Sequence, residues 1–356
     1  MLNRPTVNTL VALPSSNKEG KRMMKKIITL AIVLLLVVGS VHAEFARVGS
    51  AGAQFLKVGV GPRYEAMGNA AVAMVDDIYA AYWNPAGLAE IENIAIGFTN
   101  VDYALDVSLN YFAIGKYFED VGTFALSANV LSMGDQEITT FENQEGTGDY
   151  YTSTSFAIGI SYARQLTNRF AFGGTVKYVG ERIHNSNSNG FAFDFGTMLY
   201  TGYRSLRIGM AISNLGSEMK FTGSDLDVGY DGLSGSGSNE SVGAELKTSP
   251  YNLPMVFRVG MAYDIQMGPK SLVTLSSELK HPNDNIQQGS IGAEFGYAEK
   301  FFVRGGYKLN YDEETFSMGG GLKTSITSTT RMFIDYSWQD FGRLESTQRF
   351  SLGFTF

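Results

Sequence analysis

The chain ends on Phe350-Ser351-Leu352-Gly353-Phe354-Thr355-Phe356, a stretch in which every second side chain is apolar and the last residue is aromatic. Successive side chains of a β-strand point to opposite faces, so the apolar residues share one face and the small residues share the other. One face suits lipid and the other suits a wet lumen, which predicts the closing strand of a membrane β-barrel. A terminal strand of this kind also predicts recognition by the assembly machinery of the Gram-negative outer membrane, with Phe350, Leu352, Phe354 and Phe356 as the signal.

The same alternation recurs from Ile94 onward, in units of about ten residues separated by turns or polar loops. Charged side chains fall on the face opposite to the apolar ones in one unit after another. Phe302 and Phe333 are misfits, because each is an aromatic residue on the polar face. The pattern therefore predicts a barrel over residues 94–356 with a charged lumen, whose cations include Arg207, Arg258, Arg304 and Lys308.

The connections between these units fall into two classes. Six are short and centre on 119–120, 167–168, 202–203, 268–269, 298–299 and 328–329. Seven are longer or more polar and lie around Tyr103 and over 134–150, 184–189, 216–251, 281–286, 311–314 and 341–345. Thirteen connections join fourteen antiparallel strands, and an even number of strands returns the carboxyl terminus to the periplasmic side, where turns are short.

Composition agrees with a barrel and excludes a bundle of membrane helices. Mean hydropathy is −0.04, and beyond the amino-terminal region no stretch supplies the roughly 20 apolar residues that a spanning helix needs. A closed barrel needs apolar residues only at alternate positions. A soluble two-sheet sandwich shares the alternation, but it does not explain why charges keep to one face in successive strands. The net charge of −7 argues against a basic surface for nucleic acid.

The amino-terminal region reads as a signal peptide. Met24-Lys25-Lys26 is the charged start, residues 27–38 are a short apolar core, and Val41-His42-Ala43 is a small-residue cleavage site. We expect export through the Sec pathway with cleavage after Ala43, and residues 1–22 read as an over-extended gene start. The chain contains no Cys, which excludes a lipid-modified cysteine, disulfides and thiolate metal sites.

Residues 44–93 differ in character from the barrel and are rich in Gly and Ala. Asp77 is expected to cap a short helix that Pro85 ends, since the residue before a proline disfavours helix. The lumen of a fourteen-stranded barrel is wider than side chains alone can fill, so we expect this segment to plug it. The proposed plug motif is Asp76, Asp77, Trp83, Asn84, Pro85, Ala86 and Gly87. We expect three of these residues, Asp76, Asp77 and Asn84, to meet the luminal Arg207, Arg258 and Arg304.

Two parts of this segment resemble a known family. Gly61-Pro62-Arg63-Tyr64-Glu65-Ala66-Met67-Gly68-Asn69-Ala70, then Asp76-Asp77 and Ala81-Tyr82-Trp83-Asn84-Pro85-Ala86-Gly87-Leu88, are similar to the amino-terminal signature of the PorV/PorQ family. That family belongs to the FadL-like group of outer-membrane barrels, which share an Asn-Pro-Ala element in a luminal hatch. The resemblance implies an outer-membrane component of type IX protein secretion, which receives the carboxyl-terminal signal domains of secreted clients and passes them to a surface-attachment complex.

The residues needed for enzyme chemistry are missing. Once the signal peptide is removed, only His184 and His281 remain as histidines, too few for a catalytic triad or a multi-His metal site. Asp225, Asp227 and Asp231 superficially resemble a calcium loop, but the twelfth position holds Ser236 instead of the bidentate Glu. We therefore expect no enzyme activity, no cofactor and no metal.

Two functions remain open. In the first, the plug closes the pore and the long loops 216–251 and 134–150 bind a secreted client or another secretion subunit. In the second, the barrel is a FadL-like channel for hydrophobic small molecules such as long-chain fatty acids. The polar inward faces favour the first, while Phe302 and Phe333 leave room for a small apolar pocket. A purely structural role is the third possibility. The expected partners are outer-membrane lipid, the barrel-assembly machinery and secretion proteins, with no nucleic acid.

Overall fold

The computed structural model describes residues 48–103, 107–230 and 242–356. The expected signal peptide lies outside these residues. Before the barrel come four short helical turns: η1 (Gln54–Lys57), α2 (Pro62–Glu65), α3 (Ala80–Trp83) and η2 (Pro85–Glu90). Within the described part of the chain, no helix has the length and apolar character to cross a membrane.

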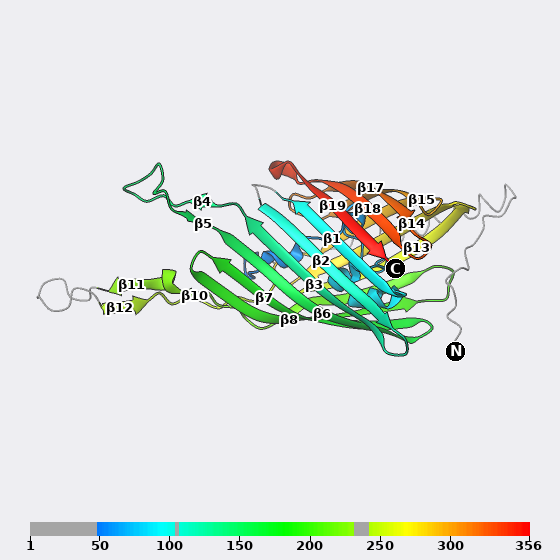
Figure 1. Ribbon diagram of the computed structural model, residues 1–356, viewed down its shortest axis with the longest axis horizontal. Helices are drawn as coiled ribbons and strands as arrows, with labels where there is room; N and C mark the ends of the chain where they lie inside the picture. Colours follow the sequence, from blue (N-terminus) through cyan, green and yellow to red (C-terminus); the bar gives the residue numbers. More distant parts are fainter. Residues whose placement is uncertain (1–47, 104–106, 231–241) are drawn as a thin grey trace, which may run out of the picture.

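Fourteen antiparallel strands form a closed ring (Figure 1). The first strand pairs with the last, with Ile96 opposite Phe354, and pairing of β8 with β9 completes the circle. The prediction of a fourteen-stranded barrel is confirmed. The strands are β1 (Ile94–Asp102), β2 (Val107–Phe118), β3 (Gly122–Met133), β6 (Ser153–Thr167), β7 (Phe170–Ile183), β8 (Ser186–Tyr200), β9 (Arg207–Gly216), β13 (Val256–Gly268), β14 (Ser271–Pro282), β15 (Gln288–Tyr297), β16 (Phe301–Leu309), β17 (Phe316–Ser325), β18 (Arg331–Asp340) and β19 (Ser346–Thr355).

The two ends of the barrel differ. The turn end carries the short connections and the carboxyl terminus, and the loop end carries the long ones. Two loops project far beyond the loop end as narrow hairpins (Figure 1). The remaining elements belong to the loops: β4 (Gln136–Glu137), β5 (Tyr150–Tyr151), β10 (Thr222–Gly223), η3 (Ser224–Leu226), β11 (Asp227–Tyr230), β12 (Val242–Glu245) and η4 (Gly342–Leu344).

One expected loop is a tight turn. The polar run 184–189 predicts a loop, but only His184 and Asn185 lie between β7 and β8. His184 adopts a positive φ of 51°, which reverses the chain at once. The polar residues from Ser186 to Asn189 pair with β7 as strand. Polarity alone therefore misplaced the boundary, because the end of a barrel strand lies above the membrane and can be polar on both faces.

Side chains alternate between the faces as the sequence indicates. On β19, Phe350 is 47% exposed while Ser351 is fully buried. The cations Arg258, Arg304 and Lys308 are buried on the inner face of the wall. Phe302 and Phe333 also lie on the inner side, where both line a luminal cavity. A closed barrel satisfies its backbone hydrogen bonds within the wall, so its outer face can be apolar throughout.

Candidate functional site

Residues 48–93, here called the plug, run through the lumen from the loop end to the turn end (Figure 1). At the loop end, the Gly52 amide donates to the Asn252 carbonyl at 3.0 Å, and Lys57 Nζ lies 2.9 Å from Asp284 Oδ2. At the turn end, η2 leads within a few residues into β1, at Ile94. Most of the plug between these ends is buried against the inner wall.

The Asn-Pro-Ala element ties the plug to itself and to the wall. Asn84 is fully buried. Its side-chain amide donates to the Val72 carbonyl at 2.7 Å and to the Thr197 carbonyl of β8 at 3.1 Å, while its oxygen accepts from the Ala86 amide. Pro85 begins η2, where its missing amide hydrogen costs nothing. The motif is therefore a turn that requires both the amide donor and the carbonyl acceptor of the Asn84 side chain.

Trp83 fixes the neighbouring part of the plug. Its ring nitrogen donates to the Val60 carbonyl at 2.8 Å, and the guanidinium carbon of wall residue Arg258 lies 5.5 Å from its ring centre. The helix in this region is shorter than expected. It begins at Ala80, and the Asp77 carboxylate accepts from the Tyr79 amide ahead of it.

Pairs of glycines that face each other across neighbouring strands make room for the plug backbone. Three such pairs are cross-strand partners: Gly173 with Gly196, Gly209 with Gly260, and Gly292 with Gly306. A Cβ added to any of these six glycines would come within 2.7 Å of a plug atom. The first pair would meet residues 84–85, the second would meet Val72, and the third would meet residues 67–68. These pairs, here called the glycine seats, let the plug approach the wall more closely than any side chain would permit.

Buried charges also join the plug to the wall. Glu65 of the plug pairs with Lys308 at 2.6 Å and with Arg349 at 3.6 Å. In the other direction, wall residue Glu278 accepts from the plug amides of Ala71 and Val72, both at 2.9 Å. Charge-assisted hydrogen bonds of this kind are stronger than neutral ones. Glu65 lies inside the signature quoted above, but its role depends on two wall strands and could not be predicted from local sequence.

The expected pairing of plug carboxylates with three wall arginines is wrong. Asp76 and Asp77 instead face Arg63 of the plug itself, at 2.6 and 3.8 Å. The wall arginines are neutralised within the wall: Arg207 by Asp264, Arg258 by Glu278, and Arg304 by Glu294 and Asp335. The reason is register, since Glu294 stands directly opposite Arg304 on the neighbouring strand and lies closer than any plug group.

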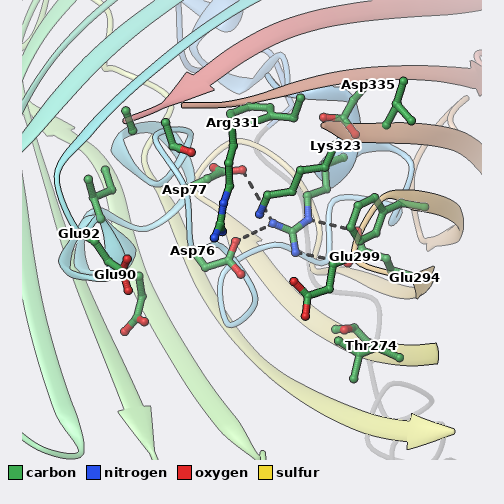
Figure 2. A pocket seen from close by; sticks show the side chains of 18 of the residues that line it. Asp76, Asp77, Glu90, Glu92, Thr274, Glu294, Glu299, Lys323, Arg331 and Asp335 are labelled. Atoms are coloured by element: carbon green, nitrogen blue, oxygen red, sulfur yellow. Dashed lines mark hydrogen bonds and ion pairs between the residues drawn. The ribbon is translucent and has the colours of Figure 1, made fainter. Parts of the chain in front are cut away.

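A cavity of about 570 Å³ lies at the turn end between the plug and the wall. Figure 2 shows Asp76, Glu294, Glu299, Lys323 and Arg331 around it. Phe302 and Phe333 line it together with several aliphatic residues, and charged residues make up half of the lining. Its carboxylates are Asp76, Asp77, Glu90, Glu92, Asp264, Glu294, Glu299 and Asp335, and its cations are Arg63, Arg207, Arg304, Lys323 and Arg331. The cavity, here called the vestibule, therefore has a mixed lining in which charges of both signs face apolar side chains.

Asp77 makes the vestibule sensitive to pH. Burial raises the pKa of its carboxyl group to about 6, while the neighbouring Arg63 guanidinium acts in the opposite direction. An unfolded Asp has a pKa of about 3.9. Because the folded protein holds this proton more tightly, the stabilisation from this group is fully present below pH 4 and is lost as pH rises through 6.

We expect the wild type to lose about 1 kcal/mol of stability relative to Asp77→Asn between pH 5 and pH 7. The Asn variant cannot titrate, so the difference between the two proteins isolates this carboxyl group from others that titrate in the opposite direction. Denaturant unfolding of both proteins at the two pH values measures it. A difference that is the same at both pH values would contradict the assignment.

Among residues 48–103, 107–230 and 242–356, no three His, Asp or Glu side chains lie close enough together to hold a metal ion. In the loop considered for calcium, Asp225 accepts from the amide and side chain of Asn185 at 2.9 and 3.1 Å, and Asp231 and Ser236 lie outside the described residues. Asp225 therefore holds the β9–β13 loop against the β7–β8 turn.

A closed barrel with an apolar exterior, a charged lumen and an internal plug defines an outer-membrane β-barrel protein. Within that class, the chain belongs to the PorV family: the family described as Type IX secretion system protein PorV matches residues 41–231, more than half of the chain. No curated protein sequence matches it significantly.

Solved structures with the same fold include hydrocarbon channels and a FadL homologue. The CymD monoaromatic hydrocarbon channel aligns with a TM-score of 0.53 and 13% identity, covering 84% of this chain and 98% of CymD. The Ralstonia pickettii toluene transporter TbuX aligns at 0.51 and 14%, covering 83% and 97%. A Pseudomonas aeruginosa FadL homologue aligns at 0.51 and 13%, covering 83% and 98%. At these identities the likeness concerns the fold alone.

Proposed function

We propose that this protein is a closed outer-membrane barrel that binds secreted proteins of a type IX system through its loop end and passes them to a surface-attachment complex. Membership of the PorV family supports the secretion role. The observation that carries the binding role is the pair of hairpins that project from the loop end (Figure 1). Recognition is commonly placed on loops that a rigid scaffold presents.

The hairpins have the features of a protein-binding surface. Phe141 is 93% exposed at the tip of the β4–β5 loop, and Tyr150 and Leu246 are more than half exposed nearby in their loops. Within the described part of the chain, the β11–β12 ribbon pairs with no third strand, so both of its outer edges are open to further pairing. An extended segment of another protein can add to such an edge by main-chain hydrogen bonds.

The plug supports a closed pore in this proposal. Three glycine seats and the buried ion pairs of Glu65 hold the plug against opposite parts of the wall. Transport of a client through the lumen is therefore not part of the proposed role, and binding takes place outside. In this proposal the motif residues from Asp76 to Gly87 help the plug to close the pore and do not form a ligand site.

A hydrophobic solute channel is the second candidate, because Phe302 and Phe333 face the vestibule and several solved structures of this fold are hydrocarbon channels. The charged lining of the vestibule disfavours an apolar solute. The two functions predict that different molecules co-purify with the barrel: proteins in the first case, and lipids or hydrocarbons in the second.

Export and assembly complete the proposal. Cleavage after Ala43 would leave Glu44 as the first residue, which the intact mass of the isolated protein tests. Phe350, Leu352, Phe354 and Phe356 would be read by the assembly machinery before the barrel closes between β19 and β1.

Replacing both hairpins (135–151 and 224–246) with short Gly-Ser linkers is expected to lower client recovery at least tenfold. The loss follows if exposed loop residues supply 1.4 kcal/mol or more of the binding free energy. The measurement is quantitative mass spectrometry of proteins and lipids isolated with the barrel from solubilised outer membrane. A matched control changes Arg343 and Leu344 to Ser, two exposed residues of another loop at the same end.

Undiminished client recovery from the barrel without hairpins would refute the proposed binding role. Recovery of stoichiometric lipid or hydrocarbon in place of proteins, from wild type and variant alike, would favour the channel. In both cases the barrel fold is verified separately by its resistance to SDS before heating.

A further inference from the structure

The outer face of strands β6, β7 and β8 carries an aromatic cluster near the loop end. Tyr178 of β7 stands between Phe156 of β6 and Phe191 of β8, with ring centres 6.0 and 5.4 Å away. All three rings lie on the outward face of the wall, the same face as the exposed Val176 of β7. Aromatic side chains gather at the level where the hydrocarbon of a membrane meets its headgroups. The cluster therefore marks the outer boundary of the membrane on this side of the barrel.

Directly beyond this cluster the outer face becomes polar and cationic. Arg182 lies four residues after Tyr178 on the same face of β7, roughly 13 Å farther along the strand. Its cross-strand neighbours are Thr154 on β6 and Asn187 on β8. A row of polar side chains thus stands just above the aromatic cluster, at the depth of lipid headgroups.

Arg182 is held in place but retains free donors. Its Nε donates to the His184 carbonyl at 3.1 Å. Among the described residues no carboxylate forms an ion pair with it, whereas its neighbour Glu181 faces inward and accepts from the Tyr251 hydroxyl. The guanidinium lines a cavity of about 290 Å³ whose other lining residues are Tyr150, Tyr151, Thr152, Thr154, His184 and Asn185. The size suits a headgroup fragment better than a whole ligand.

We propose that this cavity binds the phosphorylated headgroup of a lipid in the outer leaflet of the membrane. The planar guanidinium of Arg matches a phosphate with two parallel hydrogen bonds. The Tyr, Thr and Asn side chains around it supply donors and acceptors for the sugar hydroxyls of a phosphorylated glycolipid. The acyl chains would then descend along Phe156, Tyr178 and Phe191. The depth of the site, next to the aromatic cluster, favours a lipid over free phosphate.

The test measures binding of three probes to the full-length barrel in detergent by native mass spectrometry and by competition. The probes are diphosphoryl lipid A, the same glycolipid without its phosphates, and inorganic phosphate. Arg182→Gln is compared with Arg169→Gln, which removes the same charge at the opposite end of the same β6–β7 hairpin. Arg182→Lys asks whether the guanidinium shape matters in addition to the charge.

We expect Arg182→Gln to weaken lipid A binding about tenfold, as expected for the loss of a charged hydrogen bond, and Arg169→Gln to leave it unchanged. Dephosphorylated lipid should bind the wild type as weakly as lipid A binds the Gln variant. Equal binding by Arg182→Gln and wild type would overturn the proposal. So would inorganic phosphate that saturates the site at concentrations where it blocks lipid A, since the site would then be one for free phosphate.

Discussion

Gly306→Ala is expected to push the plug away from the barrel wall, whereas Gly305→Ala, one residue earlier in the same strand, is expected to leave it docked. A Cβ on Gly306 would lie 2.0 Å from the Gly68 nitrogen and 2.2 Å from the Met67 carbonyl carbon, both backbone atoms of the plug. Backbone cannot move aside as the end of a flexible side chain can. A Cβ on Gly305 would meet nothing within 4 Å.

The plug cannot easily yield at this position. Gly68 has a φ of +68°, which other residues rarely adopt, and a Cβ there would itself lie 3.0 Å from the Tyr307 nitrogen. The Gly68 amide also donates to Ser317 on the next strand. Overpacking of this kind costs about 1–3 kcal/mol or more. We expect Gly306→Ala to weaken docking by at least about 2 kcal/mol.

Two measurements report this displacement. Conductance in planar bilayers should rise from closed or rare openings in the wild type and Gly305→Ala to frequent openings in Gly306→Ala. Hydrogen exchange should accelerate in residues 60–75 of Gly306→Ala while the strands remain protected. Equal conductance and equal exchange in the two variants would show that the seat does not hold the plug.

These seats show which part of the fold the sequence can predict. Alternation of apolar and polar residues determines which face each side chain takes, and this alone predicts the strands, their number and the closing pair of β1 with β19. The glycine seats depend on cross-strand partners such as Gly292 and Gly306, which are fourteen residues apart in the chain. Their pairing follows from the register between neighbouring strands, which alternation within one strand does not determine.

The charges illustrate the same limit. The face that a side chain takes depends only on its position along one strand, and Arg258, Arg304 and Lys308 are buried. The partner of each charge depends on neighbouring strands. Arg304 therefore pairs with Glu294 across the wall, and the plug contributes Glu65 instead of Asp76 or Asp77. The signal for these ion pairs is an opposite charge at the facing position of the neighbouring strand. It can be read only when the strands are paired in their correct register.

Glu65→Gln is expected to destabilise the docked plug by about 3–5 kcal/mol, since it leaves buried cations without their full compensation. Lys308 and Glu65 are each 1% exposed in their side chains, and Arg349 is 3% exposed. Water cannot replace the missing carboxylate at such burial. Glu314 still pairs with Lys308 at 2.6 Å, so the effect should appear chiefly around Arg349, whose Nε donates to the Gly59 carbonyl of the plug.

Glu313→Gln is the matched control. It removes the same charge from an ion pair with Arg343, whose side chain is 89% exposed at the loop end. Exposed pairs contribute about 0–1 kcal/mol. Denaturant unfolding and hydrogen exchange of residues 59–69 should therefore change strongly in the first variant and little in the second. Similar small effects in both would mean that the buried pair does not hold the plug.

A double variant separates the pairing of charges from simple packing. In Glu65→Leu with Lys308→Met, both members of the closest pair are replaced by apolar groups, and a buried pair exchanged in this way often costs little. Arg349 would remain charged without Glu65, and Glu314 would remain charged without Lys308, so restoration should be partial. The double variant should still dock more firmly than Glu65→Leu alone by about 1 kcal/mol or more, as a coupling energy between contacting residues. If the two substitutions instead add, the plug is held by shape at the glycine seats, and the charges only satisfy one another.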